Sequence, residues 1–503
     1  MGLSCSMPTH ESFYNRWRES AMDSAQFREQ LIGRMTPERL RILWQGQPLK
    51  NPSITTLEGS QITILHPGFN HPDQNQLLRR AVLRMDGETL SGADIMLDPE
   101  GGCWHGQRRD LDSAYAKVKL LVTWDGKPYA PGHPPCFRMA DHYLDRDSTT
   151  LHENSLWIPP LEPSVLPKTC RAPMQTLLEQ GVRQLSREAS LSRLWRLTAI
   201  LEDRMDRAGG QSTLWHHLFC SMGYRHNQWP MYHLSQHLEA LTQGMQGRKD
   251  PAQDQLLTMQ ARLLGCGGFL EEPVESFPTT NQDYLARLQK VWRVDKAKLH
   301  EASMPAAIWY NQGIRPSNHP QRRLATLAHW LLGPSLDQAV VSWFEGTQDA
   351  DQARHTLHQL LLGGNDPFWE IHWTLHGRAL KNAKALIGRM RINELALSTL
   401  LPWLMARYSQ QEDLIAQQKV EDLYLQWPSF EDHALLEQAR RRLLGSDHHH
   451  WIQTATDQIG LIQILQDFCS KSDHDCDQCL FQACSQMARL KQIWGSAGTS
   501  LSG

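Results

Sequence analysis

Apolar and polar residues alternate along one block of the chain, residues 59–124, and this pattern predicts β-strands. The alternation is clearest in Gln61–Leu65, Arg80–Met85 and Lys117–Val122. Successive side chains of a strand face opposite ways, so this spacing suits strands that are buried on one face. Asp86-Gly87 is the strongest hairpin signal in the chain, and Pro67-Gly68 marks an earlier turn.

The pattern changes twice after this block. From Asp125 to about Pro173 the chain is rich in proline, which indicates loops and extended segments, with one further strand around Cys136–Met139. From Met174 onward apolar residues recur at helical spacing, and Gly209-Gly210 ends the first long helix. Later helices are predicted at Leu256–Leu264, Tyr284–Trp292, Gln321–Leu332, Ala379–Arg391, Glu394–Tyr408 and Leu435–Leu444.

The sequence therefore predicts a small α/β domain followed by a large, mostly α-helical one. We place an N-terminal tail and helix at residues 1–35, the α/β domain at 36–170 and the α-helical domain at 171–460. A C-terminal cysteine cluster and tail occupy residues 461–503.

Composition adds few constraints on function. The 51 Lys and Arg residues nearly balance the 54 Asp and Glu residues, so any basic surface must be local. Eighteen tryptophans favour a well-packed globular protein. No apolar run in the first thirty residues suggests a signal peptide, and apolar stretches such as Leu395–Met405 fall short of the ~20 residues that a membrane span needs. We expect a cytoplasmic protein without a membrane partner.

Several short motifs occur in a fixed order along the chain, from about residue 36 to residue 481. The motifs are Glu38-Arg39-Leu40 with Trp44-Gln45, Trp104-His105-Gly106, Ala114-Tyr115, Gly223-Tyr224-Arg225-His226-Asn227, Leu263-Leu264-Gly265, Gly268-Phe269-Leu270, Arg315-Pro316-Ser317-Asn318-His319-Pro320 with Arg322-Arg323-Leu324, and Asp467-Phe468-Cys469 with Cys476 and Cys479. Through their order and spacing, these motifs together resemble a bacterial family, domain of unknown function 2851.

The resemblance implies a PD-(D/E)XK nuclease-like fold, a restriction-endonuclease-like α/β domain. In such a fold an Asp and a Glu on adjacent strands hold Mg²⁺ for phosphodiester hydrolysis. Matching Ala81 and Gly92 to the family puts Leu77 at the position of the Asp, Ile95 at that of the Glu and Leu97 at that of a following His. All three positions are apolar, so we expect a degenerate nuclease centre with no catalytic residues, a pseudoenzyme.

One alternative keeps a metal site. His71-Pro72-Asp73 resembles the family's Pro-Asp pair, and Asp94 or Asp98 could supply a second carboxylate. Strand parity puts Ile95 and Leu97 on one face and both of these aspartates on the other. We favour solvent-facing or turn carboxylates over a cation site formed by Asp73, Asp94 and Asp98.

The C-terminal cysteines are a second candidate metal site. Cys469, Cys476, Cys479 and Cys484 place four soft ligands within sixteen residues, enough for Zn²⁺ or a [4Fe–4S] cluster, and spacing alone does not separate the two. The competing interpretation is free or buried thiols. The pairs His372/His376 and His233/His237 are also spaced to share a metal, but 24 histidines make such pairs common by chance.

Basic residues within or beside the strand block suggest where a phosphate backbone could bind. They are Arg79, Arg80, Arg108, Arg109, Lys117 and Lys119. Two further basic clusters have an equally good structural interpretation. Arg315 with Arg322-Arg323 fits a rigid turn that leads into a helix, and Arg440-Arg441-Arg442 fits a solvated helix face.

Three functions remain open at this point. The first is a catalytically inactive nuclease-like module that binds nucleic acid or a protein partner. The second is an active Mg²⁺-dependent nuclease that uses Asp73, Asp94 and Asp98. The third is a helical interaction scaffold in which the α/β domain has only a structural role.

Overall fold

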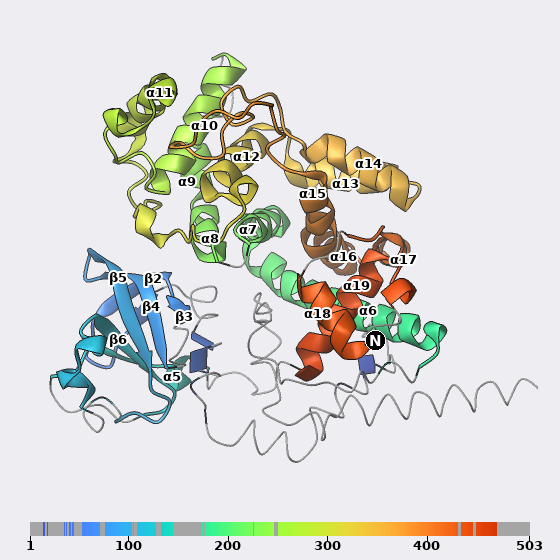
Figure 1. Cartoon of the computed structure of the whole chain (residues 1–503), viewed down its shortest axis with the longest axis horizontal. Helices are drawn as coiled ribbons and strands as arrows, with labels where there is room; N and C mark the ends of the chain where they lie inside the picture. Colours follow the sequence, from blue (N-terminus) through green and yellow to red (C-terminus); the bar gives the residue numbers. More distant parts are fainter. Residues whose placement is uncertain are drawn as a thin grey trace, which may run out of the picture.

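The computed structural model describes most of the chain between residue 53 and residue 469. The described residues are 14, 15, 18, 35, 37, 40, 41, 43, 44, 53–70, 76–102, 104, 108–126, 132–143, 174, 177–224, 226–245, 250–430, 434–445 and 449–469. An N-terminal β-sheet precedes a mostly helical region, and Figure 1 shows the sheet set to one side of the helices. The predicted α+β arrangement is therefore present.

Seven strands form one mixed sheet. The strands are β1 (Ser53–Thr55), β2 (Gln61–His66), β3 (Phe69–Asn70), β4 (Leu77–Met85), β5 (Glu88–Leu97), β6 (Val118–Thr123) and β7 (Cys136–Arg138). Their order is β1-β2-β4-β5-β6-β7, with β3 paired to β4 beside this path. The pairs β5–β6 and β6–β7 are parallel, and the other pairs are antiparallel.

The hairpin predicted at Asp86-Gly87 joins β4 to β5. Met85 pairs with Glu88, which leaves Asp86 and Gly87 as the two turn residues. Both have positive φ, 49° and 91°, as a two-residue turn of type I′ requires. Local turn chemistry thus explains which two strands pair and how they are aligned next to the turn.

The two faces of the sheet bury different residues. One face carries Ile62, Leu83, Ile95 and Leu97 and packs on Trp44, whose indole Nε1 donates to the carbonyl of Pro67 at 3.0 Å. The opposite face carries a small cluster of its own, which consists of Leu77, Met96, Trp104, Val118, Leu121 and Cys136. Burial on both faces explains why several strands have few polar positions.

Single helical residues such as Tyr14 and Trp44 precede the sheet, while the helices with described bounds follow the strands in sequence. They are α5 (Ala140–Tyr143), α6 (Glu179–Ala208), α7 (Gly210–Met222), α8 (Gln228–Gln236), α9 (Leu238–Thr242), α10 (Ala252–Cys266), α11 (Thr279–Asp295), α12 (Pro320–Leu332), α13 (Leu336–Gly346), α14 (Ala350–Leu361), α15 (Arg389–Leu395), α16 (Leu401–Gln410), α17 (Leu414–Gln426), α18 (Ala434–Leu443) and α19 (Ala455–Ile464). Gly209, with φ 79°, separates α6 from α7 as predicted. None of the described helices is long and apolar enough to cross a bilayer.

Two buried clusters hold the helices together. The larger one joins α7 to α17 and includes Trp309, Trp369, Trp403 and Trp427, all nearly or fully buried. The smaller one packs the first half of α6 against α18 and α19. In Figure 1 the long helix α6 lies beside α16, α18 and α19, so it connects the two groups of helices.

The predicted helix at Ala379–Arg391 is wrong for most of its length. Residues 379–388 form turns and extended chain, and α15 begins only at Arg389. The fully buried Arg322 explains the difference, because its guanidinium donates to the carbonyls of Lys384 and Ala385 at 2.7 and 3.0 Å. Carbonyls that bind a side chain from another helix are not free to form a helical ladder.

The sheet contacts the helical region directly. Leu65 and Val82 belong to the larger helical core, and α8 lies over β2 in Figure 1. The Phe69 ring lies 5.3 Å from that of Tyr310, and the Arg80 guanidinium donates to the carbonyl of Ala307 at 3.3 Å. The two parts of the chain are therefore packed together through both apolar and polar contacts.

Candidate functional site

The sheet has a β-bulge on β4 next to Asp94 of β5. Arg79 and Arg80 both stand opposite this single residue, and Arg80 has a left-handed φ of 59°. A bulge of this kind inserts an extra residue into one strand and redirects the side chains beside it. The flanking pairs are Leu78–Ile95 and Ala81–Ala93.

A second irregularity lies on the other side of Asp94, in β6. Asp94 pairs with Val118, but the next residue of β5 pairs with Leu120, so Lys119 is an extra residue. The backbone N–H of Asp94 also donates to the carbonyl of Lys117 at 2.8 Å. Both neighbours of β5 are thus interrupted at the same point, and basic residues occupy both interruptions.

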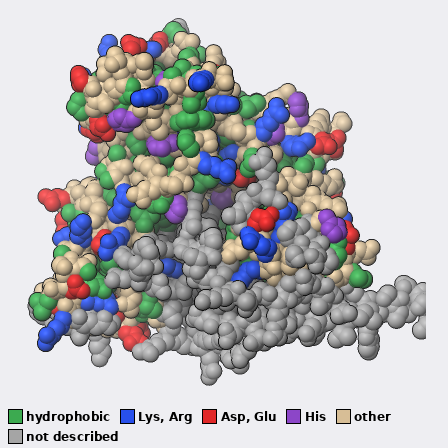
Figure 2. Space-filling view, viewed as in Figure 1, with side chains coloured by type: hydrophobic (Ala, Val, Ile, Leu, Met, Phe, Trp, Pro, Cys, Tyr) green, Lys and Arg blue, Asp and Glu red, His purple; other side chains and the backbone are tan. Residues whose placement is uncertain are grey.

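Three of these basic residues are exposed and form a local group, which we name the bulge cations: Arg79, Lys117 and Lys119. Within the described residues, none of the three has an ion pair or a side-chain hydrogen bond. Arg80 differs, because its guanidinium is 5.8 Å from the centre of the Phe69 ring and also contacts Ala307. Figure 2 shows basic side chains dispersed among acidic and polar ones over the face it draws, with no large continuous basic area among the coloured residues.

The other predicted phosphate contacts, Arg108 and Arg109, lie in different environments. Arg108 is exposed and has a left-handed φ of 53°. Arg109 is buried, and its guanidinium donates to Gln76 Oε1 at 2.6 Å and lies 5.1 Å from the ring of Tyr115. Arg109 therefore binds groups inside the protein.

Leu77, Ile95 and Leu97, which occupy the positions of the family's nuclease residues, do not all lie on the same face of the sheet. Ile95 and Leu97 are fully buried in the core on one side of the sheet. Leu77 is also buried, but it pairs with Met96 and lies in the cluster on the other side. The three residues are apolar, as the sequence states, and the structure adds that they are buried. An acid at Leu77 would nevertheless point away from acids at the other two positions.

Asp94 and Asp98 are buried, so the expectation that they face solvent is wrong, whereas Asp98 does begin a turn, because its carbonyl accepts the backbone N–H of Gly101 at 3.2 Å. The exposed fractions of the two aspartates are 4 % and 1 %. Asp94 Oδ1 accepts the backbone N–H of Arg80 at 3.3 Å, which ties the acid to the bulge on β4. Burial of a carboxylate is costly unless hydrogen bonds or charges compensate, so Asp94 has a structural partner of its own. Asp73, the third acid of the alternative site, lies outside the described residues.

The side chains of the four cysteines predicted to bind zinc or an iron–sulfur cluster are not described. Cys476, Cys479 and Cys484 lie outside the described residues, and Cys469 is described only as the last residue of the π-helical turn Leu465–Cys469. In the part of the chain that the structure covers, no three His, Cys, Asp or Glu side chains come close enough together to hold a metal ion. The zinc or iron–sulfur site stays a prediction.

The two histidine pairs have structural roles. His233 and His237 are adjacent at the end of α8, with ring centres 4.8 Å apart, and burial lowers the pKa of His233 to about 3. His372 and His376 lie in a segment of turns and bends, not on one helix face. His372 stacks on Phe368, while His376 Nε2 lies 3.4 Å from Glu272.

Arg322 and its neighbour Arg323 lie in the core, in agreement with the interpretation of this basic motif as a structural turn leading into a helix. Arg322 and Arg323 are buried, whereas Arg315 is exposed. Arg323 donates to Asn318 Oδ1 at 2.6 Å and to the Tyr224 hydroxyl at 3.0 Å. Two of the motifs that carry the family resemblance thus meet in one hydrogen-bonded cluster. The third basic run is partly structural too, because Arg440 on α18 is buried and lies 3.6 Å from Glu437.

Sequence reasoning missed two features of this region. The bulges around Asp94 leave no signal in one strand read alone, because they are defined by the register between strands. A hollow between α6, α17 and α19 was also missed. Its only signal is the spacing of Arg183 and Arg187, one helical turn apart.

Comparisons with known proteins identify the family and nothing more specific. No match was found among curated proteins or among solved structures. The family model described as protein of unknown function (DUF2851) matches residues 38–433, which is most of the chain. The chain belongs to this family.

Proposed function

We propose that this protein is a non-cleaving module that binds the phosphate backbone of nucleic acid through its sheet. The observation that carries the proposal is the pair of bulges around Asp94, which leaves Arg79 exposed on β4 and Lys117 and Lys119 exposed around the start of β6, on either side of β5. Lysine and arginine side chains that neutralise phosphates supply sequence-independent affinity for nucleic acid. Bulges that re-aim side chains are typical of binding surfaces.

The absence of cleavage is the second part of the proposal. Ile95 and Leu97 replace the family's acid and base with side chains that are fully buried in the core. Asp94, the nearest acid, accepts a backbone hydrogen bond from Arg80. A hard cation such as Mg²⁺ needs several oxygen ligands; Ile95 and Leu97 supply none, and one oxygen of Asp94 already accepts a backbone hydrogen bond.

The test compares binding by the wild-type protein with binding by a triple variant, Arg79→Gln/Lys117→Gln/Lys119→Gln. Fluorescence anisotropy of labelled duplex DNA and RNA at low salt measures the affinity. We expect the triple variant to bind at least about tenfold more weakly to every sequence, because phosphate contacts carry no sequence information. A control variant, Lys290→Gln/Arg293→Gln/Lys298→Gln, removes three exposed cations from and just after α11 and should bind like the wild type. Equal binding by all three proteins would overturn the proposal.

A second candidate, a Mg²⁺-dependent nuclease, is favoured by one observation. Asp94 and Asp98 are both buried carboxylates, and Asp94 lies on the sheet face opposite Ile95 and Leu97. With Mg²⁺ or Mn²⁺ present, this candidate predicts cutting of DNA or RNA that is lost in Asp73→Ala. The non-cleaving proposal predicts intact substrate after prolonged incubation. Capture of one fixed protein partner without salt-dependent retention on nucleic acid would instead favour the helical scaffold.

A further inference from the structure

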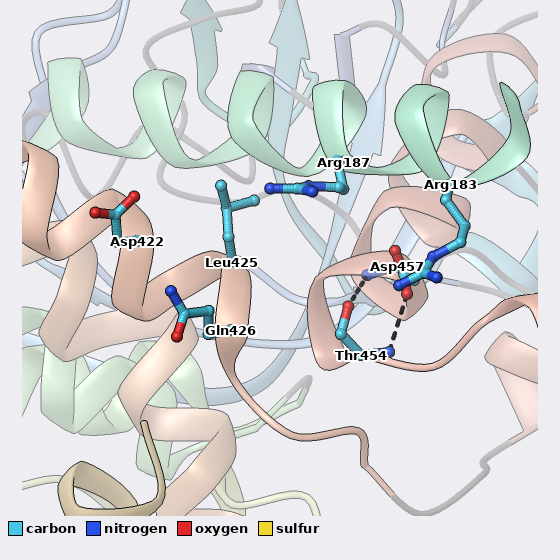
Figure 3. A pocket seen from close by; sticks show the side chains of 7 residues that line it. All are labelled: Arg183, Arg187, Asp422, Leu425, Gln426, Thr454 and Asp457. Atoms are coloured by element: carbon cyan, nitrogen blue, oxygen red, sulfur yellow. Dashed lines mark hydrogen bonds between the residues drawn. The ribbon is translucent and has the colours of Figure 1, made fainter. Parts of the chain in front are cut away.

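A hollow of about 370 Å³ lies between three helices of the helical region, far along the chain from the sheet. Figure 3 shows Arg183 and Arg187 reaching into it from α6, with residues of α17 on one side and of the α19 start on the other. Its volume is in the range of small-molecule sites. The lining residues are Arg183, Arg187, Asp422, Leu425, Gln426, Thr454 and Asp457.

The walls of the hollow are fixed to one another. The Tyr424 hydroxyl on α17 lies 3.2 Å from Ser190 Oγ on α6, and Thr456 Oγ1 on α19 donates to the carbonyl of Leu425 at 3.1 Å. Gly460 of α19 packs directly on Ser186 of α6, since a Cβ there would lie 1.9 Å from the Ser186 carbonyl oxygen. A site whose walls are already held in place does not lose binding energy to ordering them.

The two arginines are the cationic groups of this hollow. They lie four residues apart on α6, a spacing at which like charges repel each other. Arg183 is half-buried and Arg187 is exposed, and neither has an ion pair or a side-chain hydrogen bond within the described residues. An anion between them would remove the repulsion, and guanidinium groups bind phosphate in a bidentate manner.

The acidic residues of the hollow are not equivalent. Asp457 is buried and caps α19, because its Oδ2 accepts the backbone N–H groups of Thr454 and Gln453 at 2.9 and 3.1 Å. Asp422 is exposed, and only the side chain of Gln418 donates to it, at 3.0 Å. Asp422 and the Gln426 amide therefore retain capacity to accept hydrogen bonds from hydroxyl groups.

We propose that this hollow binds a small phosphate monoester that also carries hydroxyl groups, such as a sugar phosphate or a nucleotide. The phosphate lies between Arg183 and Arg187, and the hydroxyls donate to Asp422 and Gln426. This site is independent of the nucleic-acid surface on the sheet, because different residues form it.

Isothermal titration calorimetry of the full chain with ribose 5-phosphate, AMP and inorganic phosphate tests the proposal. We expect one of the two monoesters to bind at least about tenfold more tightly than inorganic phosphate, because hydroxyl contacts add to the phosphate contact. Tighter binding of AMP would assign the site to nucleotides, and tighter binding of ribose 5-phosphate would assign it to sugar phosphates. Failure of both monoesters to bind would overturn the proposal.

Variants of the lining residues test whether the monoester binds in this hollow. Arg183→Gln/Arg187→Gln should weaken monoester binding by about 10- to 100-fold, because two charge-assisted hydrogen bonds are lost. Asp422→Asn should reduce the preference for the monoester over inorganic phosphate while phosphate binding persists. Arg293→Gln, on the surface of α11, is the matched control and should bind like the wild type. Unchanged binding by the double arginine variant would contradict the assignment, and thermal unfolding of each variant checks that it is folded.

Discussion

Arg322 shows how one side chain can determine the path of a distant segment. It is fully buried on α12, and its guanidinium donates to the carbonyls of Trp369, His372, Lys384 and Ala385. Burial lowers its pKa to about 10, so the group stays charged at neutral pH. Charge-assisted hydrogen bonds of this kind are stronger than neutral ones, and they fix the irregular chain between α14 and α15.

Replacement of Arg322 by methionine should destabilise the protein by at least about 3 kcal/mol, because buried carbonyls lose their donors. Urea unfolding followed by circular dichroism measures the change. Arg315→Met is the matched control, since Arg315 is exposed and a surface substitution changes stability by about 0.5 kcal/mol or less. A small effect at Arg322 would mean that the segment is held by other contacts.

His66 gives the fold an acid-sensitive position. Its ring is buried between the sheet and the helical region, and burial, with smaller contributions from Arg80 and His226, lowers its pKa from 6.5 to about 3. The Nδ1 atom accepts the backbone N–H of Gly68 at 3.0 Å, which requires the neutral ring. Below pH 6.5 the unfolded chain therefore binds a proton that the folded chain does not.

The free energy of unfolding should consequently fall as the pH decreases from 6.5 toward 3, by about 1.4 kcal/mol per pH unit for this group. The unfolded His66→Gln variant cannot bind a proton at residue 66. Its loss of stability between pH 7.5 and pH 5 should therefore be about 2 kcal/mol smaller than that of the wild type. Urea titrations at the two pH values provide the comparison. Equal losses in both proteins would show that His66 does not contribute to the acid sensitivity.

At the scale of elements, the close approach of α19 to α6 depends on Gly460. The backbone of Ser186 occupies the space that a side chain would need. Both helices belong to the smaller buried cluster, and both line the hollow with Arg183 and Arg187. Any substitution at Gly460 therefore acts on the packing and on the hollow together.

Gly460→Ala should cost about 1–3 kcal/mol, as expected for overpacking of a tight contact. Differential scanning calorimetry measures the shift of the melting temperature. Gly346→Ala at the end of α13 is the control, because a Cβ there meets no atom within 4 Å. The control should be neutral or slightly stabilising. An unchanged melting temperature in Gly460→Ala would mean that α19 shifts without cost.

The elements also show which parts of the fold the sequence can predict. The strands and the Asp86-Gly87 hairpin follow from alternation and turn chemistry, and most helices follow from their spacing. The bulges at Asp94 do not, because they depend on how three strands are aligned. The missing helix at residues 379–388 depends on Arg322, which lies about sixty residues earlier in the chain.

At the scale of the whole molecule, the structure adds geometry that the family resemblance did not supply. Leu77, Ile95 and Leu97, which the resemblance placed at one site, are all buried. Their division between the two faces of the sheet could not be predicted from the sequence, because a shift of one residue in strand pairing turns a side chain to the opposite face. The proposed role of the basic residues beside Asp94 stays a prediction, and burial removes Arg109 from the exposed members of that group.

The salt dependence of nucleic-acid binding tests the central claim most directly. The measurement is the slope of log K against log salt concentration for a short DNA duplex, with the wild type and with Arg79→Gln/Lys117→Gln/Lys119→Gln. Each lost phosphate contact should reduce the magnitude of the slope by about 0.9, so we predict a difference of up to about 3 between the two proteins. Identical slopes would contradict the claim that the bulge cations bind the phosphate backbone.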